Sequence, residues 1–151
     1  MPEFASTDEV LDFAIEKEQE AQRFYQELAQ KAPSPAMAEF FHRLARQEAG
    51  HRQKLIGVKQ GRRELVKGGA VGDLKLSDYL VEVQARPDMD YQDALLVAMQ
   101  REKASFALYT DLAALAADEQ TRELFLALAR EEAGHKLHLE REYDQHVLGD
   151  N

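Results

Sequence analysis

Apolar residues recur at alternating steps of three and four along four long stretches of the sequence, the spacing of helices that bury one face in a bundle. Between the second and third stretches, over about residues 61–89, this period is lost, and glycines and prolines mark irregular chain. The pattern therefore predicts an all-α chain with one long connector. The four expected helices span about residues 7–30, 35–59, 91–117 and 118–147.

Residues that cap helices stand at the expected boundaries. Ser6 is followed three residues later by Glu9, which is the capping-box pattern for a helix start. Ser34 and Pro35 suit the N-cap and the first position of the second helix, and Asp90 is a candidate cap for the third. The first and last connections are short, so each predicts an antiparallel helical hairpin. The middle connector is long enough to return along a helix and bring the third helix in parallel to the second.

The second half of the sequence repeats the first at an offset of 84 residues, since positions 48 and 51 correspond to positions 132 and 135. We place the repeats at about residues 6–60 and 90–148, within a single domain spanning residues 1–151. The fold class that follows is a ferritin-like four-helix bundle of two antiparallel hairpins joined by a long crossover at about residues 61–89. An amphipathic segment of this crossover, at about 76–84, is expected to pack on the bundle. Other matching pairs are Glu18 and Glu102, Tyr25 and Tyr109, Leu28 and Leu112, Phe41 and Phe125, and Leu55 and Leu139.

Six ionisable residues interrupt the apolar seams near the middle of the helices. Two of the glutamates are followed three positions later by a histidine, so each such pair lies on one helix face and can reach a single metal ion. Buried carboxylates that face one another must take up protons or be paired with cations, and no Lys or Arg occupies the seams at this level. Two divalent cations balance four carboxylates, which predicts a two-metal site. The six residues are Glu18, Glu48, His51, Glu102, Glu132 and His135.

Glycine recurs inside both Glu-x-x-His motifs, as Gly50 and Gly134. A glycine within a helix costs about 1 kcal/mol of helix propensity relative to alanine. Its presence in both copies predicts a packing or close-approach reason for glycine at these positions.

Composition excludes several other kinds of function. The net charge of -9 argues against general binding to nucleic acid or to an anionic membrane surface. There is no cysteine, which excludes disulfides, thiolate metal sites and thiol catalysis. Without a basic leader or an apolar run long enough to cross a bilayer, we expect a cytoplasmic protein. His42, His138 and His146 are not expected to bind metal, and His138 is expected at the surface because its counterpart in the first repeat is Lys54.

The residues of the predicted site carry a family resemblance. The sequence resembles a rubrerythrin-type protein of the ferritin-like superfamily over nearly its whole length. The resemblance implies that Glu48 and Glu132 bridge two irons, that Glu18 and Glu102 bind one iron each, and that His51 and His135 complete the set. The motifs that carry it are Glu18-Gln19-Glu20-Ala21 with Tyr25, Glu48-Ala49-Gly50-His51, Glu102-Lys103-Ala104-Ser105 with Tyr109, and Glu132-Ala133-Gly134-His135.

The same resemblance implies a function and a role for two tyrosines. It implies a di-iron oxidoreductase that reduces peroxide or dioxygen and works as a homodimer or small homo-oligomer. Tyr25 and Tyr109 would hydrogen-bond the ligating carboxylates, although core packing explains them equally well. Rubrerythrins proper carry a four-cysteine iron domain, and since this sequence has no cysteine, an external electron-donor protein is implied. Ser105 stands where the family has a further ligand Glu, which puts efficient peroxide reduction in doubt.

Three alternatives stay open at this point. Manganese accepts the same carboxylate and imidazole ligands as iron. A ferroxidase that handles iron is a second function compatible with the ligand set, because bacterioferritins share it. A third is a non-catalytic bundle in which the metal is structural.

Overall fold

Four long helices make up most of the residues that the computed structural model describes, which are 6–61, 79 and 89–148. Their bounds lie within two residues of those expected from the sequence, and the all-α fold class is confirmed. The third helix ends at Leu115, two residues before the expected end, because Ala116 has extended backbone. The helices are α1 (Thr7–Lys31), α2 (Pro35–Gln60), α3 (Tyr91–Leu115) and α4 (Glu119–Leu148).

A polar side chain caps the start of every helix. In each case the side-chain oxygen of the residue before the helix accepts a hydrogen bond from the backbone N–H three positions further on. Such a cap stabilises a helix by about 1 kcal/mol, because it satisfies a donor that the helix itself leaves free. The pairs are Ser6 with Glu9 (3.2 Å), Ser34 with Met37 (3.2 Å), Asp90 with Asp93 (2.8 Å) and Asp118 with Thr121 (2.8 Å).

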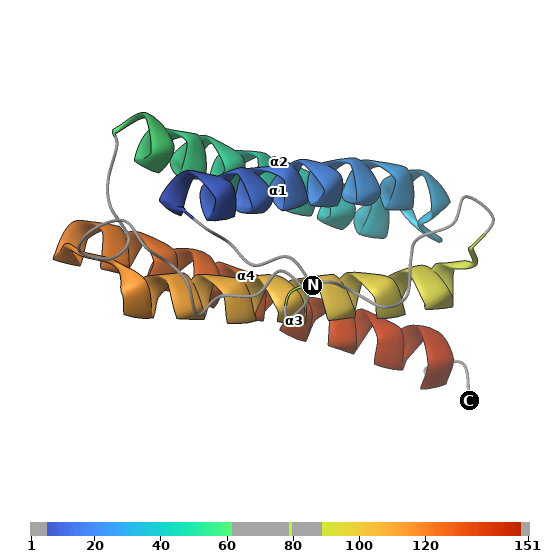
Figure 1. The fold of residues 1–151 in the computed structure, drawn as a ribbon. Coiled ribbons are helices and arrows are strands. Elements are labelled where there is room, and N and C mark those ends of the chain that lie inside the picture. The colour runs from blue at the N-terminus through green and yellow to red at the C-terminus, as the bar shows by residue number, and fades with distance from the viewer. Residues whose placement is uncertain (1–5, 62–78, 80–88, 149–151) are drawn as a thin grey trace.

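The helices form two antiparallel hairpins that lie side by side, α1 with α2 and α3 with α4 (Figure 1). Helix α3 runs parallel to α2, as the long crossover required. Most of this crossover lies outside the described residues, and so does the expected amphipathic segment at 76–84 except for Tyr79. The Tyr79 side chain is buried, and its hydroxyl donates a hydrogen bond to Asp111 Oδ2 at 2.7 Å.

The core consists of two apolar clusters, and each takes side chains from all four helices. Within α1, Leu11 and Ala14 belong to one cluster and Tyr25 and Leu28 to the other. Glu18 lies between these two pairs along the helix, so the level of the predicted site separates the clusters. Hydrophobic stabilisation therefore comes from the two ends of the bundle.

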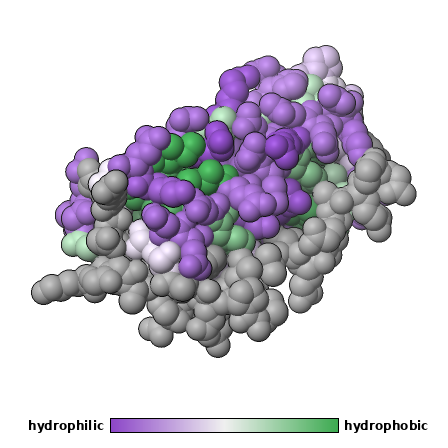
Figure 2. Space-filling view, turned by 45° about the horizontal axis from the view of Figure 1, so that its top comes forward, coloured by the Kyte–Doolittle hydropathy of each residue, from purple (hydrophilic) through white to green (hydrophobic). Residues whose placement is uncertain are grey.

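The surface is mostly polar. On the face shown in Figure 2, hydrophilic residues cover most of the described surface, with small hydrophobic areas between them. The large hydrophobic side chains that are exposed stand singly along the chain. Not one of the described helices has the length and apolar character needed to cross a membrane. Among the described residues, these exposed large hydrophobic side chains are Leu96, Phe106, Leu137 and Val147.

The expectation for the two motif glycines is wrong. A Cβ atom added at Gly50 or at Gly134 would meet no described atom within 4 Å, and both positions are exposed. Within the described part of the chain, no neighbouring element therefore requires a glycine at these positions. The sequence repeat showed that glycine recurs in both motifs, but it could not show that these positions lie on exposed faces of the helices.

We expect Gly50→Ala and Gly134→Ala each to stabilise the protein by about 1 kcal/mol, because alanine is the better helix former and finds free space. For a chain of this size that corresponds to a rise in melting temperature of about 2–4 °C, measured by circular dichroism. Gly57→Ala is the matched control, since Gly57 lies in α2 outside the motif and is equally free of neighbours. A loss of stability in both motif variants, with a gain in the control, would contradict this expectation.

Candidate metal centre

The six ionisable residues predicted from the sequence come together in the middle of the bundle. Every helix contributes one glutamate, and α2 and α4 each add a histidine one turn further along. All six side chains are buried, which is unusual for carboxylates and requires compensation. Their exposed fractions are 1% for Glu18, 0% for Glu48, 1% for His51, 2% for Glu102, 0% for Glu132 and 6% for His135.

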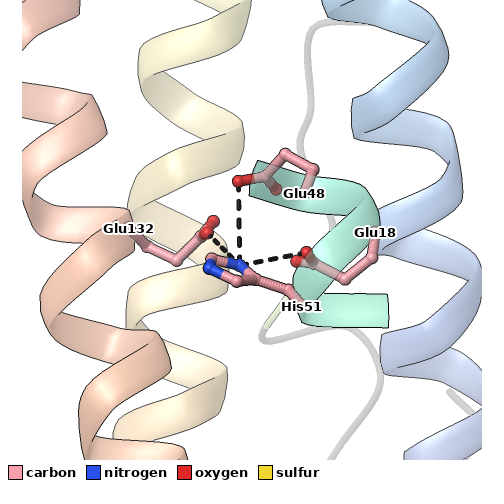
Figure 3. A group of neighbouring side chains, drawn as sticks. All are labelled: Glu18, Glu48, His51 and Glu132. Atoms are coloured by element: carbon pink, nitrogen blue, oxygen red, sulfur yellow. Dashed lines mark ion pairs between the residues drawn. The ribbon is translucent and has the colours of Figure 1, made fainter. Parts of the chain in front are cut away.

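The first half of the cluster is centred on His51. Its Nδ1 atom lies 2.8 Å from Glu132 Oε1, 3.2 Å from Glu18 Oε2 and 3.8 Å from Glu48 Oε1. Figure 3 shows these three carboxylates pointing toward the imidazole from different helices. Glu132 belongs to the other hairpin, so this half forms only where the two hairpins meet.

The second half repeats this arrangement around His135. Its Nδ1 atom lies 3.1 Å from Glu48 Oε1, 3.5 Å from Glu102 Oε2 and 3.8 Å from Glu132 Oε1. The two imidazole rings are stacked, with centroids 6.1 Å apart and planes 9° from parallel. The sequence repeat therefore becomes an approximate two-fold symmetry of the cluster.

The donor set fits two divalent cations. In each half, one atom from each of four side chains lies within 4.8 Å of the other three, and Glu48 and Glu132 belong to both halves. These two carboxylates would therefore bridge a pair of metal ions. Neither oxygen of Glu48 or of Glu132 has a hydrogen-bond partner of good geometry. Buried polar atoms left in this state are the ones a bound cation would satisfy.

Two tyrosines hydrogen-bond the carboxylates that belong to only one half of the cluster, those of Glu18 and Glu102, which we call the outer carboxylates. The Tyr25 hydroxyl donates a hydrogen bond to Glu102 Oε1 at 2.5 Å, and the Tyr109 hydroxyl donates one to Glu18 Oε1 at 2.9 Å. Each bond joins one hairpin to the other, and it occupies one carboxylate oxygen while the second faces the cluster. The Tyr25 ring is also stacked on Phe41, with centroids 6.3 Å apart. The tyrosines therefore both pack in the core and contact the predicted ligands.

Burial shapes the acid–base state of the cluster. Burial and the charge of Glu48 raise the pKa of Glu18 to about 8. Burial, the charge of Glu102 and that of Glu48 raise the pKa of Glu132 well above its usual value. Although burial opposes it, the facing side chains of His135 and Glu132 lower the pKa of Glu48. Without a metal, the cluster therefore holds protons where a cation would otherwise sit.

The histidines follow the same logic. Burial alone would lower their pKa values, but the facing carboxylates reverse this effect. The facing carboxylates of Glu102 and Glu48 raise the pKa of His135 to about 10, and the carboxylate of Glu18 raises the pKa of His51. Metal binding would displace these protons, because a ligating imidazole is neutral.

Two residues at the edge of the cluster were not predicted from the sequence. Glu131 Oε2 lies 3.2 Å from His51 Nε2, and Gln47 Oε1 lies 2.6 Å from His135 Nε2. Each stands directly before a Glu-x-x-His motif, and positions 47 and 131 obey the repeat offset of 84. That offset could have identified them as a pair. Only the packing of α2 against α4 shows that each reaches the histidine of the other hairpin.

The remaining histidines and the serine lie apart from the cluster. His42, His138 and His146 are exposed, as expected for His138, and none of them belongs to either group of four among the described residues. Ser105 is half-buried and also lies outside both groups.

We expect the metal-free protein to lose stability as the pH rises from about 5 to 8.5. The folded-state pKa of Glu18 is raised from 4.5 to about 8, and that of His135 from 6.5 to about 10. In this range the folded chain therefore holds protons that the unfolded chain has released, which favours folding at the lower pH. Each net proton is worth about 1.4 kcal/mol per pH unit, or about 3 °C in melting temperature.

Thermal unfolding in the presence of a chelator measures this slope. Glu18→Gln should make the slope shallower, because it removes one of the titrating groups. In metal-loaded protein the trend should reverse, since protons compete with the cations for the same atoms. A metal-free protein that becomes more stable between pH 5.5 and 8.5 would refute the assignment.

Comparison with known proteins agrees with this site. The family model described as Rubrerythrin matches residues 9–76, which include most of α1 and all of α2. No curated protein matches the chain. Among solved structures, a hypothetical protein from Pyrococcus furiosus is similar, with 27% identity and a TM-score of 0.71 over 90% of this chain and 87% of that one.

Two further structures have the same fold at lower identity. A Thermotoga maritima protein described as ferritin-like and diiron-carboxylate has 21% identity and a TM-score of 0.82, over 96% of this chain and 99% of that one. A conserved hypothetical protein from Mycobacterium tuberculosis has 16% identity and a TM-score of 0.67, over 89% of this chain and 94% of that one. The family model thus matches most of the first hairpin, and the solved structures share the fold of the whole bundle.

Proposed function

We propose that this chain is a di-iron carboxylate oxidoreductase of the rubrerythrin type, which reduces peroxide or dioxygen with electrons from an external donor. The observation that carries the proposal is the buried cluster itself. Four carboxylates and two imidazoles form two overlapping groups of ligand atoms that share Glu48 and Glu132. Among the described residues, no Lys or Arg forms an ion pair with any of the four carboxylates.

Iron is the metal that the comparisons support best. Carboxylate and imidazole ligands suit both iron and manganese, so the ligand set alone does not choose between them. The family match to Rubrerythrin and the description of the Thermotoga maritima structure as a diiron-carboxylate protein both favour iron. Two ferrous ions held here would supply the two electrons that convert one peroxide and two protons into two waters.

The protein itself keeps water away from the metal site and fixes the orientation of the ligating side chains. Apolar clusters at both ends of the bundle keep bulk water away from the ligand level, which strengthens electrostatic interactions inside it. Tyr25 and Tyr109 hold one oxygen of Glu102 and of Glu18, so that the other oxygen faces the cluster. With both tyrosine hydroxyls donating to carboxylates, the outer ligands are positioned before any metal arrives.

The electron source and the assembly complete the proposal. The 151 residues contain no cysteine, and therefore this sequence holds no thiolate iron centre to feed the cluster. We assign the supply of electrons to a separate redox protein, and we expect a homodimer or small homo-oligomer. Elution as a very large assembly that stores ferric iron would favour iron handling instead.

Oxidation of protein loaded anaerobically with ferrous iron tests the proposal. Stopped-flow mixing with peroxide, and separately with dioxygen, should give rapid oxidation of the wild-type protein and the absorption of an oxo-bridged ferric pair. Glu132→Ala removes a carboxylate shared by both halves and should slow oxidation by about 100-fold or more. Glu123→Ala is the matched control, because Glu123 is an exposed carboxylate on the same helix. If neither oxidant oxidises the wild-type protein, the proposed function is wrong.

The two tyrosines can be tested separately from their packing role. Tyr25→Phe and Tyr109→Phe keep the ring and remove the hydroxyl, so we expect metal affinity to fall by about 10-fold while the fold is retained. Competition with a chelating dye measures the affinity. Tyr91→Phe is the control, since the Tyr91 hydroxyl donates to Glu142 Oε1 at 2.9 Å, away from the cluster. Unchanged affinity in both test variants would mean that these tyrosines serve core packing alone.

A further inference from the structure

The approximate two-fold symmetry of the cluster is broken at one pair of positions. Every predicted ligand has an identical partner in the other repeat, and so do the two tyrosines. The residues that contact the outer nitrogen of each histidine differ. His51 Nε2 meets the carboxylate of Glu131 at 3.2 Å, whereas His135 Nε2 meets the amide oxygen of Gln47 at 2.6 Å.

The orientation of the rings decides how these contacts act. In both histidines Nδ1 faces the buried carboxylates, which leaves Nε2 directed at the edge of the bundle. When Nδ1 binds a cation, Nε2 must carry the proton and donate it to the residue outside. Gln47 is therefore placed to accept a hydrogen bond from a ligating His135, and Glu131 lies close enough to accept one from a ligating His51.

The two acceptors do not increase the metal affinity of their histidines equally. A hydrogen bond to a carboxylate is charge-assisted and roughly twice as strong as one to a neutral amide. A carboxylate behind a ligating histidine also raises the basicity of the ring toward the metal, and removing such a partner typically costs 10–100-fold in metal affinity. The Glu131 side chain is 42% exposed, so water screens part of its charge, and a hydrogen bond formed when His51 binds a cation would carry most of the effect.

We propose that the two metal positions are unequal, that Glu131 makes the position at His51 the tighter one, and that Gln47 leaves the position at His135 the weaker one. This inference rests on the proposed metal-binding function. Glu131 and Gln47 are positioning residues, since each acts through a histidine and neither belongs to the two groups of ligand atoms. The first divalent cation to enter should therefore occupy the group formed by Glu18, Glu48, His51 and Glu132.

Variants with a single histidine separate the two positions. His135→Ala keeps the position at His51, and His51→Ala keeps the position at His135. We would titrate each with Co²⁺ alone, following its visible absorption and the heat of binding. The His135→Ala protein should bind its Co²⁺ about 10-fold more tightly than the His51→Ala protein.

Substitutions at Glu131 and Gln47 then test whether these residues cause the difference in Co²⁺ affinity. Glu131→Gln should weaken Co²⁺ binding about 10-fold in the His135→Ala protein and leave it unchanged in the His51→Ala protein, where its partner is absent. Gln47→Glu should strengthen binding about 10-fold in the His51→Ala protein and leave the His135→Ala protein unchanged. These crossed backgrounds form a double-mutant cycle that isolates the hydrogen bond from the general effect of charge.

Three results would overturn the inference. They are equal affinity of the two single-histidine proteins, no effect of either exchange, and an equal effect of Glu131→Gln in both backgrounds. If a single-histidine variant does not fold, the exchanges are made in the otherwise wild-type chain. There Glu131→Gln should weaken the first of two binding steps and Gln47→Glu should strengthen the second, and the opposite result refutes the inference. Wild-type protein that binds no Co²⁺ at all would instead refute the proposed function.

Discussion

The placement of four carboxylates at one buried level is the constraint on which the rest of this structure depends. Apolar surroundings penalise each charge, and the carboxylates also repel one another. The chain contains this cost by placing hydrophobic clusters on both sides of the level and by making each glutamate face an imidazole or a tyrosine hydroxyl. The middle of the bundle therefore holds the candidate metal ligands, while the apolar clusters at its two ends stabilise the fold.

Duplication of one hairpin explains how so costly a level is assembled. Each hairpin contributes two glutamates, one histidine and one tyrosine to the cluster, and neither contribution forms a complete half of the cluster by itself. Tyr25 reaches Glu102, Tyr109 reaches Glu18, and His51 reaches Glu132, so the contacts of the cluster run between hairpins. Binding of cations that share ligands from both hairpins is therefore coupled to the docking of one hairpin on the other.

Local signals account for what could be predicted from the sequence. Helix bounds follow from apolar spacing and from caps such as Ser34, because both act within a few residues. The buried cluster of six ionisable residues could be predicted because polar residues at core positions recur with a fixed offset. Gln47 and Glu131 were missed because their role depends on which helix each one faces, a property of tertiary packing. Gly50 was misjudged for the same reason, since its helix face turned out to be open.

Where the symmetry breaks is itself informative. A change among the six buried residues would remove a ligand or leave a carboxylate without compensation, and either is costly. Positions 47 and 131 are exposed, so a carboxylate and an amide are both tolerated there without a desolvation penalty. Because each contacts the outer nitrogen of a predicted ligand, the difference still reaches the cluster. In a duplicated bundle, residues just outside the ligand level are thus where two equivalent half-sites can become unequal at little cost in stability.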